Sequence, residues 1–222
     1  MTKQFKSFSA TDFHAICDKL ARKDKCLAGV IEQHGYPPMW TRPNSFETMV
    51  HFILEQQVSL ASALAALEKL REKIRLITPD RLLHLSDGEL RECYFSRQKI
   101  LYVKTLASAI TDRQIDLKDM ETLPDAQIRE KLIALKGIGN WTIDVYLMFV
   151  LHHTDIFPVG DLAVRNAAIV IKNLPLDSSK EDILKKAEIW KPYRTVAAMI
   201  LWHYYLKTRA PKSGKNTMTA PV

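Results

Sequence analysis

Residues 135–142 read Leu-Lys-Gly-Ile-Gly-Asn-Trp-Thr, with Gly137 and Gly139 between two stretches of helical hydrophobic spacing. Glycine adopts backbone angles that are closed to other residues, so the pair predicts a tight turn from one helix into the next. The N–H groups at the start of the second helix would then face outward, where they can bind an anion such as phosphate. Turns of this kind also join helices for purely structural reasons, and the pattern alone leaves both interpretations open.

A lone carboxylate, Asp161, follows downstream in the sequence Phe-Pro-Val-Gly-Asp of residues 157–161. We expect a helix over residues 162–171, and an aspartate directly before a helix is usually its N-cap. The N–H groups of the helix also stabilise the ionised carboxylate. A carboxylate held in this way can serve both capping and catalysis, so the structural and the catalytic interpretation stand side by side.

Hydrophobic residues recur at helical spacing along most of the chain, and no segment shows convincing period-two alternation. The fold class is therefore predicted to be all-α, with roughly ten helices and short loops. We expect three N-terminal caps in particular: Thr11 or Asp12 for the first helix, Ser86 with Glu89, and Ser178 with Glu181.

Two loops interrupt the helical pattern in the first third of the chain. Residues 36–40, Tyr-Pro-Pro-Met-Trp, form a stiff extended segment that we interpret as a lid packed on the core by Trp40. Residues 55–59, Glu-Gln-Gln-Val-Ser, form a polar turn between two apolar helices, with Ser59 as the cap of the second. Such a turn is either simply exposed or presents a side chain to a ligand.

The length of 222 residues fits one domain or two closely packed lobes. We expect a flexible arm over residues 1–10, a helical domain over residues 11–208, and a basic disordered tail over residues 209–222. No signal peptide opens the chain, and the longest apolar run, Val145–Leu151, is far shorter than the ~20 residues of a membrane span. These features predict a cytoplasmic protein, associated with the nucleoid if it is bacterial.

The formal net charge is +7 at pH 7, which favours a polyanionic partner, nucleic acid first and an acidic membrane second. The three cysteines are widely spaced, which argues against a disulfide framework, a zinc site and a four-cysteine iron–sulfur cluster. The side chains of the only adjacent histidines, His152 and His153, would point in different directions on a helix, which argues against a metal site there. We expect no cofactor and no metal, except that a monovalent cation at the carbonyls of the glycine turn is left open.

Four motifs, taken in order, resemble the helix-hairpin-helix DNA glycosylase superfamily, and within it the compact form of the 3-methyladenine-DNA glycosylase II type. They are the glycine turn with residues 157–161, the segment 46–59 with its Gln-Gln-Val-Ser, residues 95–99, and residues 190–194 leading to Trp202. Together they cover most of residues 40–205. The resemblance implies a two-lobed all-α fold with a central cleft for DNA and the flipped base, and a hairpin at about residues 126–152.

The resemblance also implies roles for individual residues. Asp161 would be the catalytic carboxylate, and Gln57 would take the place of the wedge that fills the gap left by a flipped base. Trp202 matches the family's pocket tryptophan, and we nominate Trp141 and Tyr146 as its neighbours. The residues expected to hold the DNA backbone are Gly137, Ile138, Gly139, Thr142, Ser96, Arg97 and Lys99. For Arg97 and Lys99 a solvated basic face is the alternative.

Relatives that also cut the DNA backbone carry a lysine nucleophile just after the hairpin, and Trp141 occupies that position here. The resemblance therefore implies a monofunctional glycosylase that releases alkylated purines such as 3-methyladenine and 7-methylguanine in base excision repair and leaves an abasic site. The expected partner is double-stranded DNA with a damaged base, bound by a monomer. Two alternatives remain: a glycosylase for an oxidised or deaminated base, and a non-catalytic helix-hairpin-helix DNA-binding module.

Overall fold

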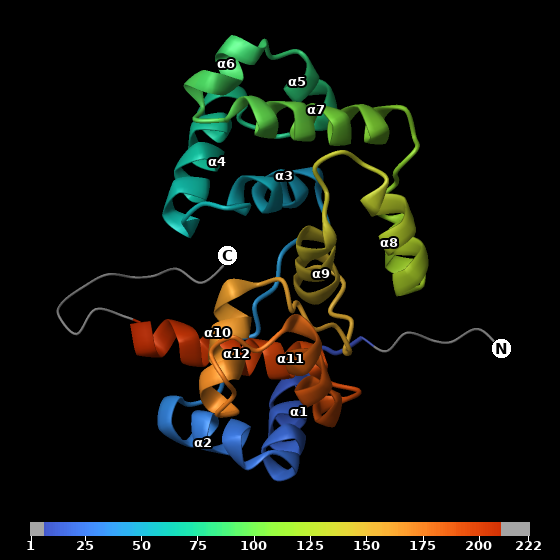
Figure 1. The fold of residues 1–222 in the computed structure, drawn as a ribbon. Helices are drawn as coiled ribbons and strands as arrows, with labels where there is room; N and C mark the ends of the chain where they lie inside the picture. Colours follow the sequence, from blue (N-terminus) through green and yellow to red (C-terminus); the bar gives the residue numbers. More distant parts are fainter. Residues whose placement is uncertain (1–6, 210–222) are drawn as a thin grey trace. The chain divides into compact units, whose positions relative to one another are not determined.

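The computed structural model describes residues 7–209, and the regular structure of this part of the chain is entirely helical (Figure 1). Its only strand-like feature within these residues is an isolated bridge between Ser7 and His153. The all-α prediction is confirmed. The described chain divides into two compact units, which we call the inserted unit (Arg42–Tyr146) and the terminal unit (the residues up to Thr41 and those from Leu147 onward).

The inserted unit is built around α7, which packs against α3, α5 and α6, while α3 also packs against α4. Its elements are α3 (Phe46–Glu55), α4 (Leu60–Ile74), α5 (Pro79–Leu83), α6 (Asp87–Glu92), α7 (Arg97–Thr111), the 3₁₀ helix η1 (Asp119–Thr122), α8 (Asp125–Ile133) and most of α9 (Asn140–Phe149). Helix α3 is buried over nearly all its residues, because it is covered on more than one side.

Burial of α3 brings a charged group into the core, where it needs a partner. Glu55 accepts two hydrogen bonds from Arg42, at 2.6 and 3.1 Å, and both side chains are almost completely buried. The guanidinium also lies 4.6 Å from the ring centre of Phe52. His51 approaches the same carboxylate to 3.5 Å, and burial, with the charges of Arg42 and Arg71, lowers its pKa to about 3. The imidazole is therefore neutral at pH 7, and Arg42 is the cation that pairs with Glu55.

The terminal unit is organised on α12, which packs against α1, α2 and α10 (Figure 1). Its elements are α1 (Ala10–Lys23), α2 (Lys25–His34), α10 (Leu162–Ile171), α11 (Lys180–Ala187), the 3₁₀ helix η2 (Glu188–Trp190) and α12 (Arg194–Arg209). The buried carboxylate of Asp24 joins three of these elements. It caps α2 through the N–H of Cys26 and accepts hydrogen bonds from Lys172 at 2.8 Å and from the Trp190 indole at 2.7 Å.

Two of the three expected caps differ in detail from the prediction. The capping box of Ser86 and Glu89 is present as predicted. Helix α1 begins earlier than expected, with Ser9 as its N-cap and the carboxylate of Asp12 accepting from Ser9. The third box is formed by Ser179 and Asp182 instead of Ser178 and Glu181, because the Ser178 hydroxyl already donates to the carbonyl of Pro175.

The arm predicted over residues 1–10 and the tail predicted over residues 209–222 fall mostly outside the described residues. Where they are described, they differ from the expectation. Phe8 is buried, stacks on Phe13 with ring centres 5.9 Å apart, and donates its N–H to the carbonyl of His152. Arg209 is the last residue of α12 and lies over the ring of Tyr205. Within residues 7–209, none of the helices combines the length and the apolar character that crossing a membrane requires.

Candidate functional site

Helices α8 and α9 form the predicted hairpin in the inserted unit, with residues 134–139 as the connection. Gly137 has φ +97°, a backbone conformation that side chains of L-residues rarely adopt. The N–H of Ile138 donates to the carbonyl of Leu135 and closes the turn. Gly139 and Asn140 are exposed at the start of α9. The N-terminal turn of α9 is therefore at the surface, where a helix N-terminus favours an anion.

The hairpin turn is also supported from α7. A Cβ atom built on Gly137 would lie 2.0 Å from Cγ of Tyr102 and within 2.5 Å of both neighbouring ring carbons. The aromatic ring thus lies directly on the glycine, and its hydroxyl accepts a hydrogen bond from Gln98. Glycine is required at position 137 for two independent reasons, the backbone angle and the space.

An ion pair joins the two helices of the hairpin. Arg129 of α8 donates to the carboxylate of Asp144 of α9 at 2.5 Å. Burial raises the pKa of Asp144 above its usual value, and the charge of Arg129 opposes this effect. The pair fixes the hairpin at the level of its helices, away from the turn.

The loop between α3 and α4 is attached to the hairpin by one side chain. The amide nitrogen Nε2 of Gln56 donates to the carbonyl of Gly137 at 2.8 Å and to Oγ1 of Thr142 at 2.9 Å. The next residue, Gln57, is exposed and has φ +58°. Ser59 then caps α4 by accepting from the N–H of Ser62, as predicted. The polar turn of residues 55–59 therefore presents Gln57 to solvent, as the wedge prediction requires.

Two of the residues predicted to hold the DNA backbone have side chains that support the hairpin itself. The side chain of Thr142 is buried, with 1% of its surface exposed, and its hydroxyl oxygen is the acceptor for Gln56. Ile138 is likewise buried, and its N–H is used within the turn. Both side chains therefore support the hairpin, and we expect the N–H groups of Gly139 and of the exposed start of α9 to face a phosphate.

The three residues proposed to contact DNA at the start of α7 differ in their exposure and in their hydrogen-bond partners. Ser96 is the N-cap of α7 and accepts from the N–H of Lys99. The Lys99 ammonium donates to the carbonyl of Leu54 at 2.5 Å, at the C-terminus of α3 where a cation is favoured, and burial lowers its pKa. Arg97 is exposed. Of the three, Arg97 presents its charge to solvent, whereas Ser96 and Lys99 fix the ends of helices.

Asp161 lies in the terminal unit at the junction that the sequence predicted. Its N–H donates to the carbonyl of Pro158 and closes a turn, and its Oδ1 atom accepts from the N–H groups of Ala163 at 2.9 Å and Val164 at 3.0 Å. Only 9% of the residue is exposed. The N-cap interpretation is confirmed, and the carboxylate is held in one orientation by the first turn of α10.

Trp202 lies in an aromatic cluster of the terminal unit. Its ring stacks on Phe149 with centres 5.2 Å apart and meets Trp40 edge-on at 6.2 Å. The indole nitrogen of Trp40 is buried and has no hydrogen-bond partner among residues 7–209. Phe149 was not predicted as a member of this cluster, because it reads as one more apolar residue of a buried helix, and Trp40 was predicted to hold a lid on the core.

The other two residues proposed for a base pocket, Trp141 and Tyr146, belong to the inserted unit. Trp141 is partly exposed near the start of α9. Tyr146 is fully buried and donates its hydroxyl to Oδ1 of Asn44 at 2.9 Å, and burial raises its pKa. The contacts of Tyr146 are those of a core residue, so it is the weakest of the pocket candidates.

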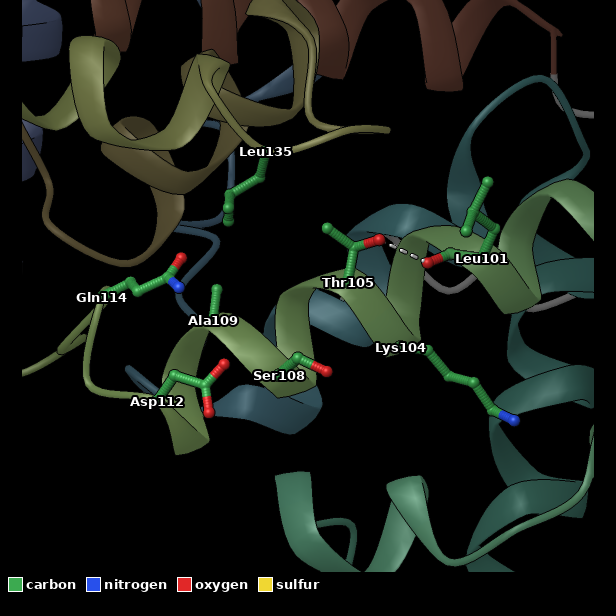
Figure 2. Close-up of a pocket in the computed structure, with 8 residues that line it drawn as sticks. All are labelled: Leu101, Lys104, Thr105, Ser108, Ala109, Asp112, Gln114 and Leu135. Atoms are coloured by element: carbon green, nitrogen blue, oxygen red, sulfur yellow. Dashed lines mark hydrogen bonds between the residues drawn. The ribbon is translucent and has the colours of Figure 1, made fainter.

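A shallow pocket of about 390 Å³ lies along α7 in the inserted unit (Figure 2). Its lining is Leu101, Lys104, Thr105, Ser108, Ala109, Asp112, Gln114 and Leu135. Among the lining residues, Lys104 pairs with Asp87 at 2.6 Å. Thr105 donates its hydroxyl to the carbonyl of Leu101. The pocket contains none of the predicted site residues. In residues 7–209 no group of three or more His, Cys, Asp or Glu side chains is placed to hold a metal ion.

Comparison with known proteins identifies the arrangement. The sequence profile of the HhH-GPD superfamily of base excision DNA repair proteins matches residues 50–192. The chain belongs to the HhH-GPD superfamily. The matched span includes the hairpin, the α3–α4 loop with Gln57, and Asp161. Trp202 lies beyond it.

Individual members of the HhH-GPD superfamily are similar over most of the chain. A Schizosaccharomyces pombe protein named DNA-3-methyladenine glycosylase 1 is 32% identical over 161 residues, 71% of either chain. The solved structure of the S. pombe 3-methyladenine DNA glycosylase in complex with abasic DNA has a TM-score of 0.80 at 26% identity, covering 90% of this chain and 100% of that one. A DNA-3-methyladenine glycosidase from Bacillus halodurans has a TM-score of 0.73 at 29% identity, covering 91% and 92%.

Proposed function

We propose that the protein is a monofunctional DNA glycosylase that hydrolyses the N-glycosidic bond of alkylated purines in double-stranded DNA. The observation that carries the proposal is the carboxylate of Asp161, fixed by two N–H groups at the start of α10 in a chain of the HhH-GPD superfamily. The names of the similar glycosylases support 3-methyladenine as a substrate, and we propose 7-methylguanine beside it as a second alkylated purine.

The chemistry of alkylated purines suits a site with one carboxylate and no strong acid. A purine alkylated at N3 or N7 carries a positive charge, so its glycosidic bond is already weakened and the base departs neutral. The sugar develops oxocarbenium character in the transition state, as in glycoside hydrolysis. An ionised Asp161 would stabilise this cation and orient or deprotonate the attacking water. Because Oδ1 is held by Ala163 and Val164, little reorganisation is needed during the reaction.

DNA binding is assigned to the exposed parts of the hairpin and the helices beside it. Gly139 and Asn140 bring the N–H groups of α9 to the surface, and the exposed Arg97 adds a positive charge. Contacts with phosphate fix position and carry no sequence information, which suits a protein that searches for damage. Gln57 would fill the gap that the flipped nucleotide leaves. Flipping costs a few kcal/mol, and less for a damaged base, so selectivity begins at this step.

The aromatic cluster is the proposed holder of the damaged base. Aromatic faces attract a cationic purine, and each favourable contact contributes about 0.5 to 2 kcal/mol. Trp202, with 9% of its surface exposed, is the member we assign to this contact, and Phe149 and Trp40 keep its ring in place. A neutral oxidised or deaminated base would gain less from these rings.

Trp141 occupies the position at which relatives that cleave the backbone are expected to carry a lysine. Without an amine there, no Schiff base with the sugar can form, and water is the nucleophile. The product is then an abasic site in an intact strand. We further propose that the protein acts as a monomer, since a single chain carries the hairpin, the wedge and the carboxylate.

The test is base release from duplexes that each carry one lesion: 3-methyladenine, 7-methylguanine, 1,N6-ethenoadenine, uracil or 8-oxoguanine. The proposal expects release of the methylated purines, with the strand left uncut until alkali is added. Release of only neutral bases would assign the protein to another lesion class. DNA binding without release of any base would make it a non-catalytic binding module.

A further inference from the structure

We propose that Gln56 is a positioning residue that locks the wedge loop (residues 56–59) to the hairpin, so that both engage DNA as one rigid element. The inference rests on the proposed function, since it specifies how one part of the DNA-binding surface is held relative to another. The residue itself does not need to touch the substrate.

The side chain of Gln56 makes two hydrogen bonds to two different residues of the hairpin. A side-chain amide carries two N–H donors on one nitrogen, in a fixed planar arrangement. Gln56 gives one to the Gly137 carbonyl in the hairpin turn and the other to Thr142 in the first turn of α9, at 2.8 and 2.9 Å. The two acceptors lie 81 and 86 residues away along the chain. Both donors are satisfied at normal hydrogen-bond distance, so the α3–α4 loop is attached to both sides of the hairpin turn.

The acceptors are themselves immobilised. Gly137 is held under the ring of Tyr102, and Thr142 has 1% of its surface exposed. Because both acceptors are tightly packed and cannot move freely, the hydrogen bonds from Gln56 hold the loop in a fixed position relative to the hairpin. Gln56 also ends α3, through its N–H on the carbonyl of Ile53, which anchors the loop at its first residue.

The wedge residue is one peptide bond away from this connection. Gln57 has φ +58°, in the left-handed region that is unfavourable for a residue other than glycine. A strained conformation of this kind persists only where its surroundings determine it. The surroundings here are Gln56 on one side and the cap of α4 at Ser59 on the other. Loss of the Gln56 contacts frees one side, so Gln57 would leave the position in which it faces the DNA.

This arrangement has a consequence for lesion recognition. The hairpin sets where the phosphate backbone lies, and the wedge must enter the stack at a fixed distance from it. A displacement of about 1 Å in such an element can cost roughly a hundredfold in rate. Breaking the connection should therefore impair insertion of the wedge at a flipped nucleotide while leaving the attraction for undamaged duplex intact, because that attraction depends on phosphate contacts.

The experiment compares Gln56→Met, Thr142→Val, Thr142→Ser, Gln57→Ala and the Gln56→Met/Gln57→Ala double variant with the wild-type protein. Gln56→Met keeps the length of the side chain and removes both donors. Thr142→Val removes one acceptor, and Thr142→Ser keeps it. Each protein is titrated with two duplexes, one undamaged and one with a tetrahydrofuran abasic-site analogue. Steady-state release of 7-methylguanine then gives kcat and KM, and thermal unfolding reports on the fold.

We expect Gln56→Met to lower the preference for the abasic duplex by roughly tenfold, with affinity for undamaged duplex within about twofold of wild type. kcat should fall by a similar factor and KM should change little, because the unflipped complex still forms. Thr142→Val should show part of this loss, and Thr142→Ser should restore it. The effect of Gln57→Ala should be several-fold smaller in the Gln56→Met background, because residues acting as one unit are not additive.

The proposal is overturned if Gln56→Met retains the wild-type preference, or if both duplexes lose affinity equally in step with a lower unfolding temperature. Full additivity of Gln56→Met and Gln57→Ala would overturn it as well. The two binding titrations need no base release, so they report on Gln56 even if the wild-type protein releases no methylated purine. That last result would instead refute the proposed function.

Discussion

Replacement of Gly137 by alanine should lower the free energy of unfolding for two separate reasons, the backbone angle at this position and the steric overlap with Tyr102. The residue has φ +97°, and its new Cβ would lie 2.0 Å from Cγ of Tyr102. The backbone angle costs about 1–2 kcal/mol for a residue with a side chain. The steric overlap adds about 1–3 kcal/mol, as for other overpacked sites, because the contacted atoms belong to the base of the ring and not to a flexible end. The sum is a loss of about 2–5 kcal/mol.

The two contributions to this loss can be separated. In a Tyr102→Ala background the ring is gone, so Gly137→Ala should cost only the ~1–2 kcal/mol of the backbone angle. Gly139→Ala is the matched control, since no atom lies within 4 Å of its Cβ position, and it should change the free energy of unfolding by at most about 0.5 kcal/mol. Urea denaturation of the wild-type protein, the three single variants and the Gly137→Ala/Tyr102→Ala double variant measures each value. A Gly137→Ala protein as stable as Gly139→Ala would show that neither the backbone angle nor the Tyr102 ring restricts position 137.

Three further predictions follow from the charges and rings. The pKa of His51 is 6.5 in the unfolded chain and about 3 in the folded protein, so between these pH values only the unfolded chain binds the proton. The free energy of unfolding should therefore fall by about 2 kcal/mol from pH 7 to pH 5. This loss should be absent in His51→Gln. Arg97→Ala should reduce the salt dependence of duplex binding by about one unit of slope. Trp202→Leu should lower kcat/KM for 7-methylguanine by roughly 2- to 30-fold with duplex affinity unchanged.

Each of these predictions has a contrary result. A pH profile that is identical in His51→Gln would show that the imidazole is not the titrating group. A salt slope unaffected by Arg97→Ala would place its guanidinium away from phosphate. A Trp202→Leu protein with full activity would make Trp202 a core residue only.

The parts of the site that the sequence predicted are those set by local chemistry. Gly137 determines its own turn through its backbone angle, and Asp161 caps the helix that directly follows it. Ser59 and Ser86 were likewise identified because a cap and its helix are neighbours in the chain. Two neighbouring serines, Ser178 and Ser179, could each have capped α11. Ser179 is the cap because the Ser178 hydroxyl donates to the carbonyl of Pro175, a contact that the sequence pattern does not reveal.

The roles that could not be predicted depend on contacts between distant segments. Gln56 looks like any polar residue of a turn until Gly137 and Thr142 are placed beside it. The sequence suggests that Lys99 binds phosphate, but its ammonium donates a hydrogen bond to the carbonyl of Leu54 at the C-terminal end of α3. Phe149 gives no signal at all, because an apolar residue in an apolar helix is expected in any core. Tertiary structure therefore reassigns residues whose chemistry allows more than one partner.

The catalytic role proposed for the Asp161 carboxylate in the release of alkylated purines is tested by the Asp161→Asn variant. Asparagine still caps a helix, so the first turn of α10 should be kept while the charge is lost. Single-turnover release of 7-methylguanine from a duplex should fall at least about a hundredfold, with unfolding temperature and duplex affinity unchanged. Release by Asp161→Asn at the wild-type rate would show that the charge of Asp161 is not needed for catalysis.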